Sequence, residues 1–189
     1  MEFQSTPLFG GAITADLPVT FQDVSTIRQI PDTQEVYLAQ TGYTSLLFDI
    51  LERVTEPEED LEALKFHLGE IVEEDVGEVR VFEEGRGVDL PGLVGVKAFT
   101  LSARAPPGEK MRGRAHEPRE VGILVLLVRL EGVGTDLVVT VNVPVGIVDD
   151  SQGQQSGDDG RLMEEGKEVL ERVRRSLEVK DWGLFVGDE

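Results

Sequence analysis

A nearly unbroken apolar run marks the C-terminal half of the chain. Residues 120–130 read EVGILVLLVRL, which is typical of a central strand that is covered on both of its faces. The glycine-bearing stretch EGVGT follows and leads into TDLVVTVNVP, residues 135–144, which is rich in β-branched side chains. This order predicts two long strands joined as a β-hairpin.

Shorter strands are predicted nearer the N-terminus. GGAITADLP, residues 10–18, indicates a first short strand that ends at its proline. DVSTIRQIP, residues 23–31, favours one helical turn capped by Asp23 or Ser25. TQEVYLA, residues 33–39, then continues as a strand. Its alternation places one set of side chains, Gln34, Val36 and Leu38, on one face, and the other set, Thr33, Glu35 and Tyr37, on the opposite face.

Three segments have helical spacing. TSLLFDILERV, residues 44–54, has leucines and other apolar residues at helical intervals and predicts a first helix. Thr55 and Glu58 match a capping box and predict the start of a second helix, which runs to about residue 68. RLMEEGKEVLERVRRSLEV, residues 161–179, has one apolar stripe and predicts a final amphipathic helix.

The remaining segments complete an α+β pattern. EVRVFEE, residues 78–84, and LVGVKAFTLSA, residues 93–103, indicate two further strands. Residues 103–118 and 149–160 are rich in proline, glycine and charge, and we expect them to form mobile loops. Since the strands are joined mainly by hairpins, we predict an antiparallel sheet covered by helices. The length of 189 residues fits a single domain over residues 1–189.

Charge narrows the classes of partner. The formal net charge is -19, which opposes binding to the phosphate backbone of a nucleic acid and to an anionic membrane surface. Residues 49–84 hold 14 acidic against three basic side chains, whereas residues 97–119 hold six basic against two acidic. The molecule therefore carries fields of opposite sign, and a basic protein partner is favoured over an acidic polymer.

Composition also sets limits on the chemistry and the cellular setting. The chain has no cysteine, which excludes disulfides and thiolate metal sites. No apolar run approaches the roughly 20 residues of a membrane-spanning helix, and we expect neither a signal sequence nor membrane insertion.

Asp32 and Glu35 are the sharpest candidate for function, because two carboxylates flank the junction of a turn with a strand. Two nearby carboxylates can divide acid and base roles if their environments separate their pKa values. They are too few to hold calcium or magnesium without further oxygen ligands. Contact with a protein partner is a further reading. The plainest reading is that Asp32 stabilises the turn and Glu35 is solvated.

Other signals of enzyme chemistry are weak. His67 and His116 do not form a paired zinc-binding pattern, and we expect structural or solvated roles for both. GRLMEEGKE, residues 160–168, resembles a phosphate-binding loop, yet its glycines are wrongly spaced and Glu168 replaces the serine or threonine that holds magnesium. We predict that this stretch is helical, and we expect no metal and no cofactor.

Several motifs resemble the Mog family of Ran-binding proteins, the Ran guanine-nucleotide release factors. They are PLFGGAIT, DVSTIRQIPDTQEVY and TDLVVTVNVP, and the resemblance extends from Pro7 to about Phe185. It implies an antiparallel sheet of about six strands between helices on both faces, a Mog/PsbP-like α/β/α sandwich. The chain departs from the family pattern near residues 151–160 and after residue 103.

The resemblance also implies a function. The expected activity is binding to the small GTPase Ran and promotion of GTP release, in support of nuclear protein import. Such a protein is a regulator and not an enzyme, and we expect a monomer in the nucleus and the cytoplasm. The family motif maps the Ran-facing surface onto six residues of this chain: Asp23, Asp32, Glu35, Arg28, Gln34 and Tyr37.

Two other functions stay open at this point. The first is a small-molecule enzyme that uses the Asp32 and Glu35 carboxylates, which requires a concave pocket and a raised carboxylate pKa beside the pair. The second is a general acidic adaptor for import factors, which would bind several basic partners with little dependence on nucleotide state.

Overall fold

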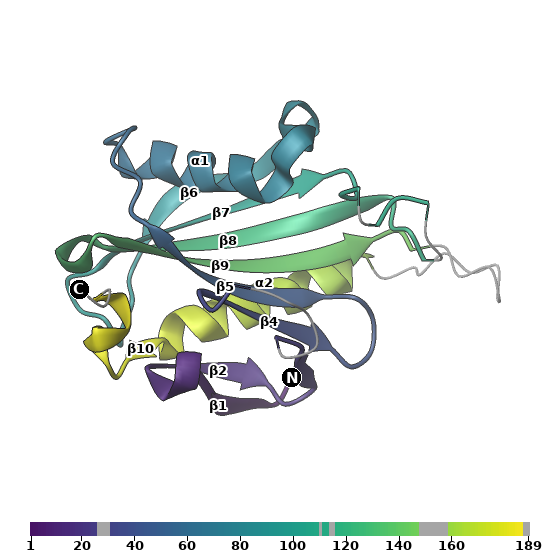
Figure 1. Cartoon of the computed structure of the whole chain (residues 1–189). Coiled ribbons are helices and arrows are strands. Elements are labelled where there is room, and N and C mark those ends of the chain that lie inside the picture. The colour runs from purple at the N-terminus through teal and green to yellow at the C-terminus, as the bar shows by residue number, and fades with distance from the viewer. Residues whose placement is uncertain (26–30, 110, 114–115, 148–158, 187–189) are drawn as a thin grey trace.

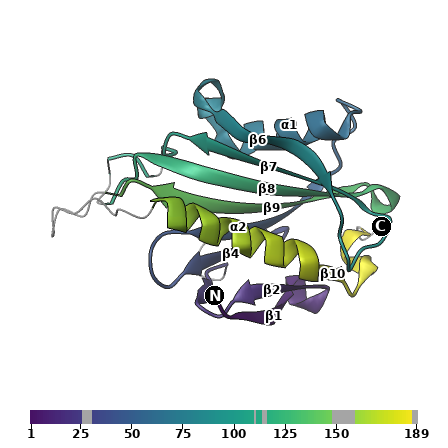
Figure 2. The ribbon, with the colours of Figure 1, turned by 180° about the vertical axis from the view of Figure 1, so that it is seen from behind.

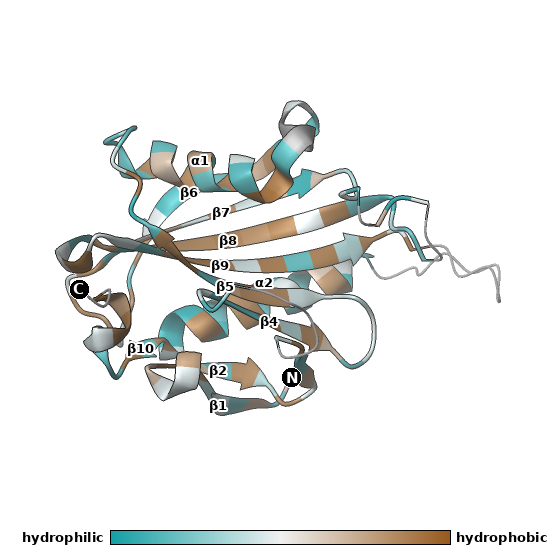
Figure 3. Cartoon of the chain, in the orientation of Figure 1, coloured by the Kyte–Doolittle hydropathy of each residue, from teal (hydrophilic) through white to brown (hydrophobic). Residues whose placement is uncertain are grey.

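Two long antiparallel strands, β8 (Glu120–Leu130) and β9 (Thr135–Val145), form the centre of the molecule. Every position of β8 from Val121 to Leu130 is buried, and its side chains point alternately to the two faces of the sheet. Figure 3 accordingly shows β8 as hydrophobic along most of its length. The predicted central hairpin is confirmed. The computed structural model describes residues 1–25, 31–109, 111–113, 116–147 and 159–186.

The described strands form two sheets. The main sheet has seven strands in the order β3-β4-β5-β9-β8-β7-β6, and all neighbouring pairs are antiparallel. A second, three-stranded sheet has the order β1-β2-β10. The other elements are β1 (Phe3–Leu8), β2 (Ile13–Pro18), β3 (Phe21–Asp23), β4 (Gln34–Ala39), β5 (Ser45–Glu52), α1 (Asp60–Val72), β6 (Arg80–Val88), β7 (Lys97–Ala105), α2 (Asp159–Ser176) and β10 (Glu178–Val179).

Helices cover the main sheet from opposite sides, as Figures 1 and 2 show. On one face Leu64 of α1 belongs to the same buried cluster as Val125 and Leu127 of β8. On the other face, Val173 of α2 belongs to the cluster that holds Leu126 of β8, and the small sheet packs there as well. The expected α+β fold with helices on both faces is confirmed, with one strand more than the six expected and an additional small sheet.

Helix α2 lies unusually close to the sheet at two glycines. A Cβ atom at Gly166 would stand 2.6 Å from the Val143 side chain, and one at Gly122 of β8 would stand 2.3 Å from the Met163 sulfur. Both distances are shorter than van der Waals contact, so any larger residue at these positions requires the Val143 or Met163 side chain to move. The stretch from Gly160 to Glu168 lies within α2. Its helical prediction is confirmed, and it does not form a phosphate loop.

The helix predicted over residues 44–54 is wrong, because most of this segment is strand β5. Leu46 and Phe48 are fully buried at a spacing of two, which is the period of a strand, while Leu51 is 38% exposed. The strand pairs along its whole length with β9, from Ser45 opposite Asn142 to Glu52 opposite Thr135. This long-range pairing overrides a leucine spacing that also suits a helix.

Several predicted boundaries also move. Helix α1 begins at Asp60 and not at Thr55, and Glu59 at its N-cap makes no side-chain capping bond. Strand β7 continues to Ala105, past the predicted start of the first mobile loop. The helical turn predicted over residues 23–31 and the loop predicted over 149–160 fall mainly outside the described residues.

A buried ion pair joins the central hairpin to α1. The Arg129 guanidinium donates to Asp136 Oδ1 at 3.0 Å, and the two side chains are fully buried. Asp136 Oδ2 lies 2.9 Å from His67 Nε2 and accepts from the Val54 N–H at 3.0 Å. Arg129 also pairs with Asp60 at 3.0 Å and donates to the Val54 carbonyl. His67 therefore has the structural role expected for it.

Hydrogen bonds keep the Asp136 carboxylate charged inside this cluster. Burial alone raises the pKa of Asp136, but the hydrogen bonds from His67 and Val54 and the charge of Arg129 hold that pKa below its usual value. A buried charge is tolerated when it is paired and when its remaining hydrogen-bonding capacity is used. The cluster meets both conditions.

Candidate functional site

Strands β3 and β4 form one edge of the main sheet and bring together two acidic residues of the candidate set. Asp23 at the end of β3 lies opposite Tyr37 of β4, and Glu35 lies two positions from Tyr37. The Asp23 carboxylate accepts from the Ser25 N–H at 2.8 Å, and the Ser25 hydroxyl accepts from the Val36 N–H at 2.9 Å. These bonds tie the residues that follow β3 to β4.

Asp32 lies in a tight turn immediately before β4, as predicted. The Pro31 carbonyl accepts a hydrogen bond from the Gln34 N–H at 3.0 Å, which closes the turn around Asp32 and Thr33. Asp32 and Thr33 are both exposed. The turn therefore presents the Asp32 carboxylate to solvent from a backbone that is held in place.

Glu35 is half-buried and is not simply solvated, which corrects the plainest reading of the sequence. Its Oε1 accepts from the Phe9 N–H at 2.6 Å, and its Oε2 accepts from the Tyr37 hydroxyl at 3.2 Å. Burial raises the pKa of Glu35, the two hydrogen bonds oppose that rise, and the nearby charge of Asp23 adds to it. The carboxylate is therefore a fixed part of the scaffold as well as an anion.

The partner of Glu35 comes from a distant and strained turn. Phe9 has a positive φ of 49°, and Gly10 and Gly11, which follow it, also have positive φ values. A left-handed backbone is costly at phenylalanine, so the bond from its N–H to Glu35 offsets part of that cost. The two segments PLFGG and PDTQEVY, which are 26 residues apart at this bond, thus meet in space. Sequence reasoning missed this contact, although both segments had been singled out.

Tyr37 contributes from the core and not from the surface. Its side chain is 6% exposed, and its ring meets the Phe48 ring edge-on at a centroid distance of 6.3 Å. Burial, and then the negative charges of Glu35 and Asp23, raise the pKa of the Tyr37 hydroxyl. Tyr37 therefore stays protonated and positions the Glu35 carboxylate.

Gln34 points to the other face of the sheet. Its amide donates to Asp49 of β5 at 2.5 Å, on the face opposite Glu35. Burial raises the pKa of Asp49, while the bond from Gln34 and the nearby His67 oppose that rise. The structure thus places Asp23, Asp32 and Glu35 along one edge, separates Gln34 from Glu35, and leaves Arg28 outside the described residues. We call the carboxylates of Asp23, Asp32 and Glu35 the acidic edge.

The enzyme reading requires a concave pocket beside Asp32 and Glu35. Two clefts of the described residues lie elsewhere, one at the ends of β6, β7 and β8 and one between Glu52 and Phe66. Neither is lined by Asp32 or Glu35. Among the residues that the structure describes, no three potential metal ligands gather as a site. The raised pKa of Glu35 has a structural cause, namely its burial against the turn at Phe9.

Comparison with known proteins assigns the chain to a family. Residues 6–144 match the family model described as the Ran-interacting Mog1 protein. The nuclear import protein mog1 of Schizosaccharomyces pombe is 29% identical over 187 residues, which cover 94% of this chain and 98% of that protein. The Ran guanine nucleotide release factor of Danio rerio is 31% identical over 151 residues, which cover 76% of this chain and 79% of that protein.

Solved structures agree with this match. The crystal structure of the Saccharomyces cerevisiae Ran-binding protein Mog1p superposes with a TM-score of 0.71 at 27% identity, covering 98% of this chain and 99% of that one. A cyanobacterial PsbP structure shares the fold with a TM-score of 0.56 at 11% identity, covering 94% of this chain and 92% of that one. By its sequence and its fold, this chain belongs to the family of Ran-interacting Mog1 proteins.

Proposed function

We propose that this protein binds the small GTPase Ran, promotes release of the bound GTP, and supports nuclear protein import. The observation that carries this function is the match of residues 6–144 to the Ran-interacting family. Relatives over most of the chain are named as a Ran guanine nucleotide release factor and as nuclear import proteins. In this role the chain is a regulator of a GTPase and performs no bond-making chemistry of its own.

The acidic edge is our proposed docking site for Ran. Asp32 is exposed on a closed turn, and Glu35 is held by hydrogen bonds from Phe9 and Tyr37. A charge that is already fixed loses little conformational entropy when a partner docks, so more of the interaction energy appears as affinity. A net charge of -19 also attracts a basic partner face at long range.

The other members of the predicted site take supporting roles in this proposal. Tyr37 positions Glu35 from the core, and Gln34 anchors β4 to β5 through Asp49. We keep Arg28 as a proposed Ran contact because it belongs to the same sequence motif as Asp32 and Glu35.

The mechanism we propose is thermodynamic linkage. A protein that binds nucleotide-free Ran more tightly than GTP-bound Ran must weaken GTP binding by the same factor. The carboxylates of the acidic edge supply this preference by pairing with Ran cations that otherwise hold the phosphates of GTP. No covalent step is needed, because the free energy that drives GTP release is the difference between the binding free energies of this protein for nucleotide-free Ran and for GTP-bound Ran.

We further propose that the chain acts as a monomeric single domain, in both the nucleus and the cytoplasm, in keeping with a role in nuclear import. Within the part of the chain that the structure describes, no helix is both long enough and apolar enough to cross a membrane.

Nucleotide release from Ran tests the function directly. We expect this protein to accelerate loss of a fluorescent GTP analogue from Ran in the presence of excess unlabelled GTP, with saturation at high protein concentration. Coupling free energies between sites are about 1–3 kcal/mol, which corresponds to an acceleration of about 5- to 150-fold if the whole effect lies in the release rate. The measurement is stopped-flow fluorescence.

A second small GTPase, loaded with the same analogue, provides the control for release. We expect its release rate to stay unchanged. An unchanged release rate for Ran would contradict the proposed function. Equal binding to Ran in both nucleotide states and to other basic proteins would instead support the general acidic adaptor.

A further inference from the structure

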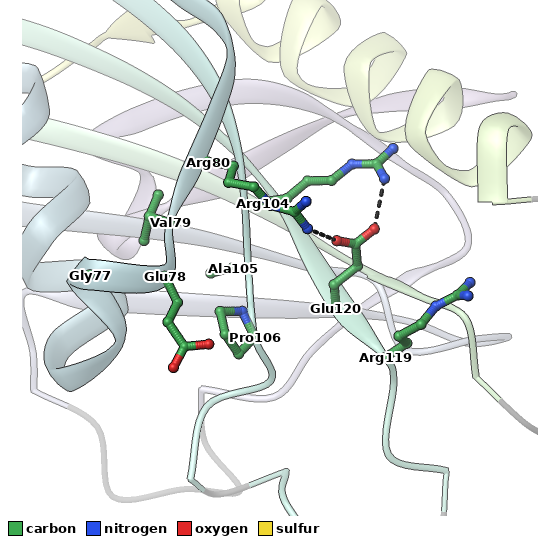
Figure 4. Close-up of a pocket in the computed structure, with 9 residues that line it drawn as sticks. All are labelled: Gly77, Glu78, Val79, Arg80, Arg104, Ala105, Pro106, Arg119 and Glu120. Atoms are coloured by element: carbon green, nitrogen blue, oxygen red, sulfur yellow. Dashed lines mark hydrogen bonds and ion pairs between the residues drawn. The ribbon is translucent and has the colours of Figure 1, made fainter.

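A basic cleft lies at the edge of the main sheet that is opposite the acidic edge. It has a volume of about 860 Å³ and is formed by the start of β6, the end of β7 and the start of β8 (Figure 4). Three arginines line it, Arg80, Arg104 and Arg119, together with only two acidic residues, Glu78 and Glu120. The lining thus has one positive charge more than it has negative charges, in a chain whose net charge is -19.

Glu120 organises two of these arginines. Arg80 and Arg104 lie directly opposite one another on β6 and β7, where two like charges repel. Glu120 bridges them, with Oε2 at 3.0 Å from Arg80 and Oε1 at 2.7 Å from Arg104. Its side chain is 18% exposed, whereas that of Arg80 is 78% exposed. One shielded carboxylate thus holds two guanidinium groups at the mouth of the cleft.

Each of the three guanidinium groups keeps donors for a ligand. A guanidinium carries five N–H donors, and the bond to Glu120 engages one nitrogen of Arg80 and one of Arg104. Arg119 is 66% exposed, and its ion pair with Asp159 spans 3.6 Å. Guanidinium groups bind carboxylates through paired N–H bonds, so this arrangement suits a ligand that bears several carboxylates.

From this geometry we propose that the cleft binds an acidic peptide segment of a second protein partner. The lining residues of the described chain include no aromatic ring on which a nucleic-acid base could stack. A long polyanion would also extend over the negatively charged remainder of the surface. A short segment experiences mainly the local field, because charges are screened beyond about 8 Å at physiological ionic strength.

The position of the cleft also favours a peptide. It opens beside β6, the outermost strand of the main sheet on that side. An outermost strand has backbone groups that no neighbouring strand engages, and extended peptides commonly pair with such edges. β4 and β7 are four strand spacings apart in the sheet order, roughly 19 Å at the usual spacing. The acidic edge and the cleft therefore lie at opposite edges of the main sheet.

Fluorescence anisotropy with a labelled octaglutamate peptide tests this proposal on the full chain. We expect saturable binding of octaglutamate and no binding of octaglutamine. Arg80→Glu should weaken octaglutamate binding about tenfold or more, since it removes one charge-assisted contact and adds repulsion. Glu120→Gln should strengthen binding several-fold, because it removes the competing negative charge and keeps the acceptor oxygen for an arginine. Thermal unfolding verifies that both variants are folded.

Arg175→Glu is the matched control, with the same change of charge at an exposed arginine of α2. It lies 16 residues beyond Asp159, about 24 Å along the helix. We expect this variant to bind octaglutamate within twofold of the unaltered chain. The proposal is overturned if the unaltered chain does not bind the peptide or if Arg175→Glu weakens binding as much as Arg80→Glu. Displacement of the peptide by inorganic phosphate or single-stranded DNA as effectively as by unlabelled octaglutamate would also overturn it.

Discussion

Replacing Asp136 by alanine is expected to lower the free energy of unfolding by about 3–5 kcal/mol, because it removes the fully buried one of the two carboxylates that pair with the buried Arg129 guanidinium. The Asp136 carboxylate has no solvent exposure and accepts from both Arg129 and the Val54 N–H. The same change leaves the Val54 N–H without its acceptor and His67 without its partner. Urea denaturation, followed by circular dichroism, measures the loss.

Two further variants separate the charge from the packing. The double variant Asp136→Leu with Arg129→Met removes both charges, and we expect it to lose much less stability than Asp136→Ala, since two apolar groups leave no unpaired charge. Glu131→Ala removes an exposed carboxylate that pairs with Lys97, and we expect its unfolding midpoint to stay nearly unchanged. An Asp136→Ala variant as stable as Glu131→Ala would show that the buried pair does not hold the hairpin and α1 together.

Reversing the charge of Glu35 is expected to weaken Ran binding by about 2–5 kcal/mol, the usual effect of disrupting one member of a buried, hydrogen-bonded charge pair. Glu35 is already partly desolvated, and its carboxylate is oriented by Phe9 and Tyr37. Glu35→Lys removes the acceptor for both of these donors and presents a cation where we propose that Ran presents its own. Titration calorimetry with nucleotide-free Ran measures the change.

The scaffold role of Glu35 requires its own control. Glu35→Gln keeps an acceptor oxygen for the Phe9 N–H and removes only the charge, so a loss of affinity without a loss of stability assigns the effect to the charge. Asp32→Lys changes an exposed residue and should mainly slow association, with a strong dependence on salt. Glu164→Lys, at a 75% exposed site on α2, should leave the affinity unchanged. If the two Glu35 variants, Asp32→Lys and Glu164→Lys all bind Ran as tightly as the unaltered chain, the acidic edge is not the docking site.

The fold was predicted best where short-range patterns and tertiary packing agree. The run from Glu120 to Leu130 is a strand over those residues, because a segment that is apolar on both sides can pack against the hydrophobic clusters on both faces of the sheet. The helix predicted over residues 44–54 was wrong because the leucine spacing is compatible with a helix. The segment is a strand because it pairs with β9, almost a hundred residues away. Local periodicity contains no information about such a partner.

In the candidate site, too, local features were predictable from the sequence and long-range contacts were not. The turn at Asp32 follows from Pro31 and is local, so it was predictable. The bond from Phe9 to Glu35 spans 26 residues and needed the three-dimensional arrangement of two turns. The Arg129–Asp136 pair had a usable signal, since a hairpin centred on the EGVG turn places these two opposite charges directly across from each other. We did not read that register from the sequence.

The central claim is that Ran docks on the acidic edge, and a crystal structure of the complex with nucleotide-free Ran tests it most directly. The decisive quantity is the distance from the Glu35 and Asp32 carboxylates to the nearest Ran lysine or arginine nitrogen. We predict an ion-pair distance, within about 4 Å, for at least one of the two. A complex in which Ran covers another surface and both carboxylates remain in solvent would contradict the account.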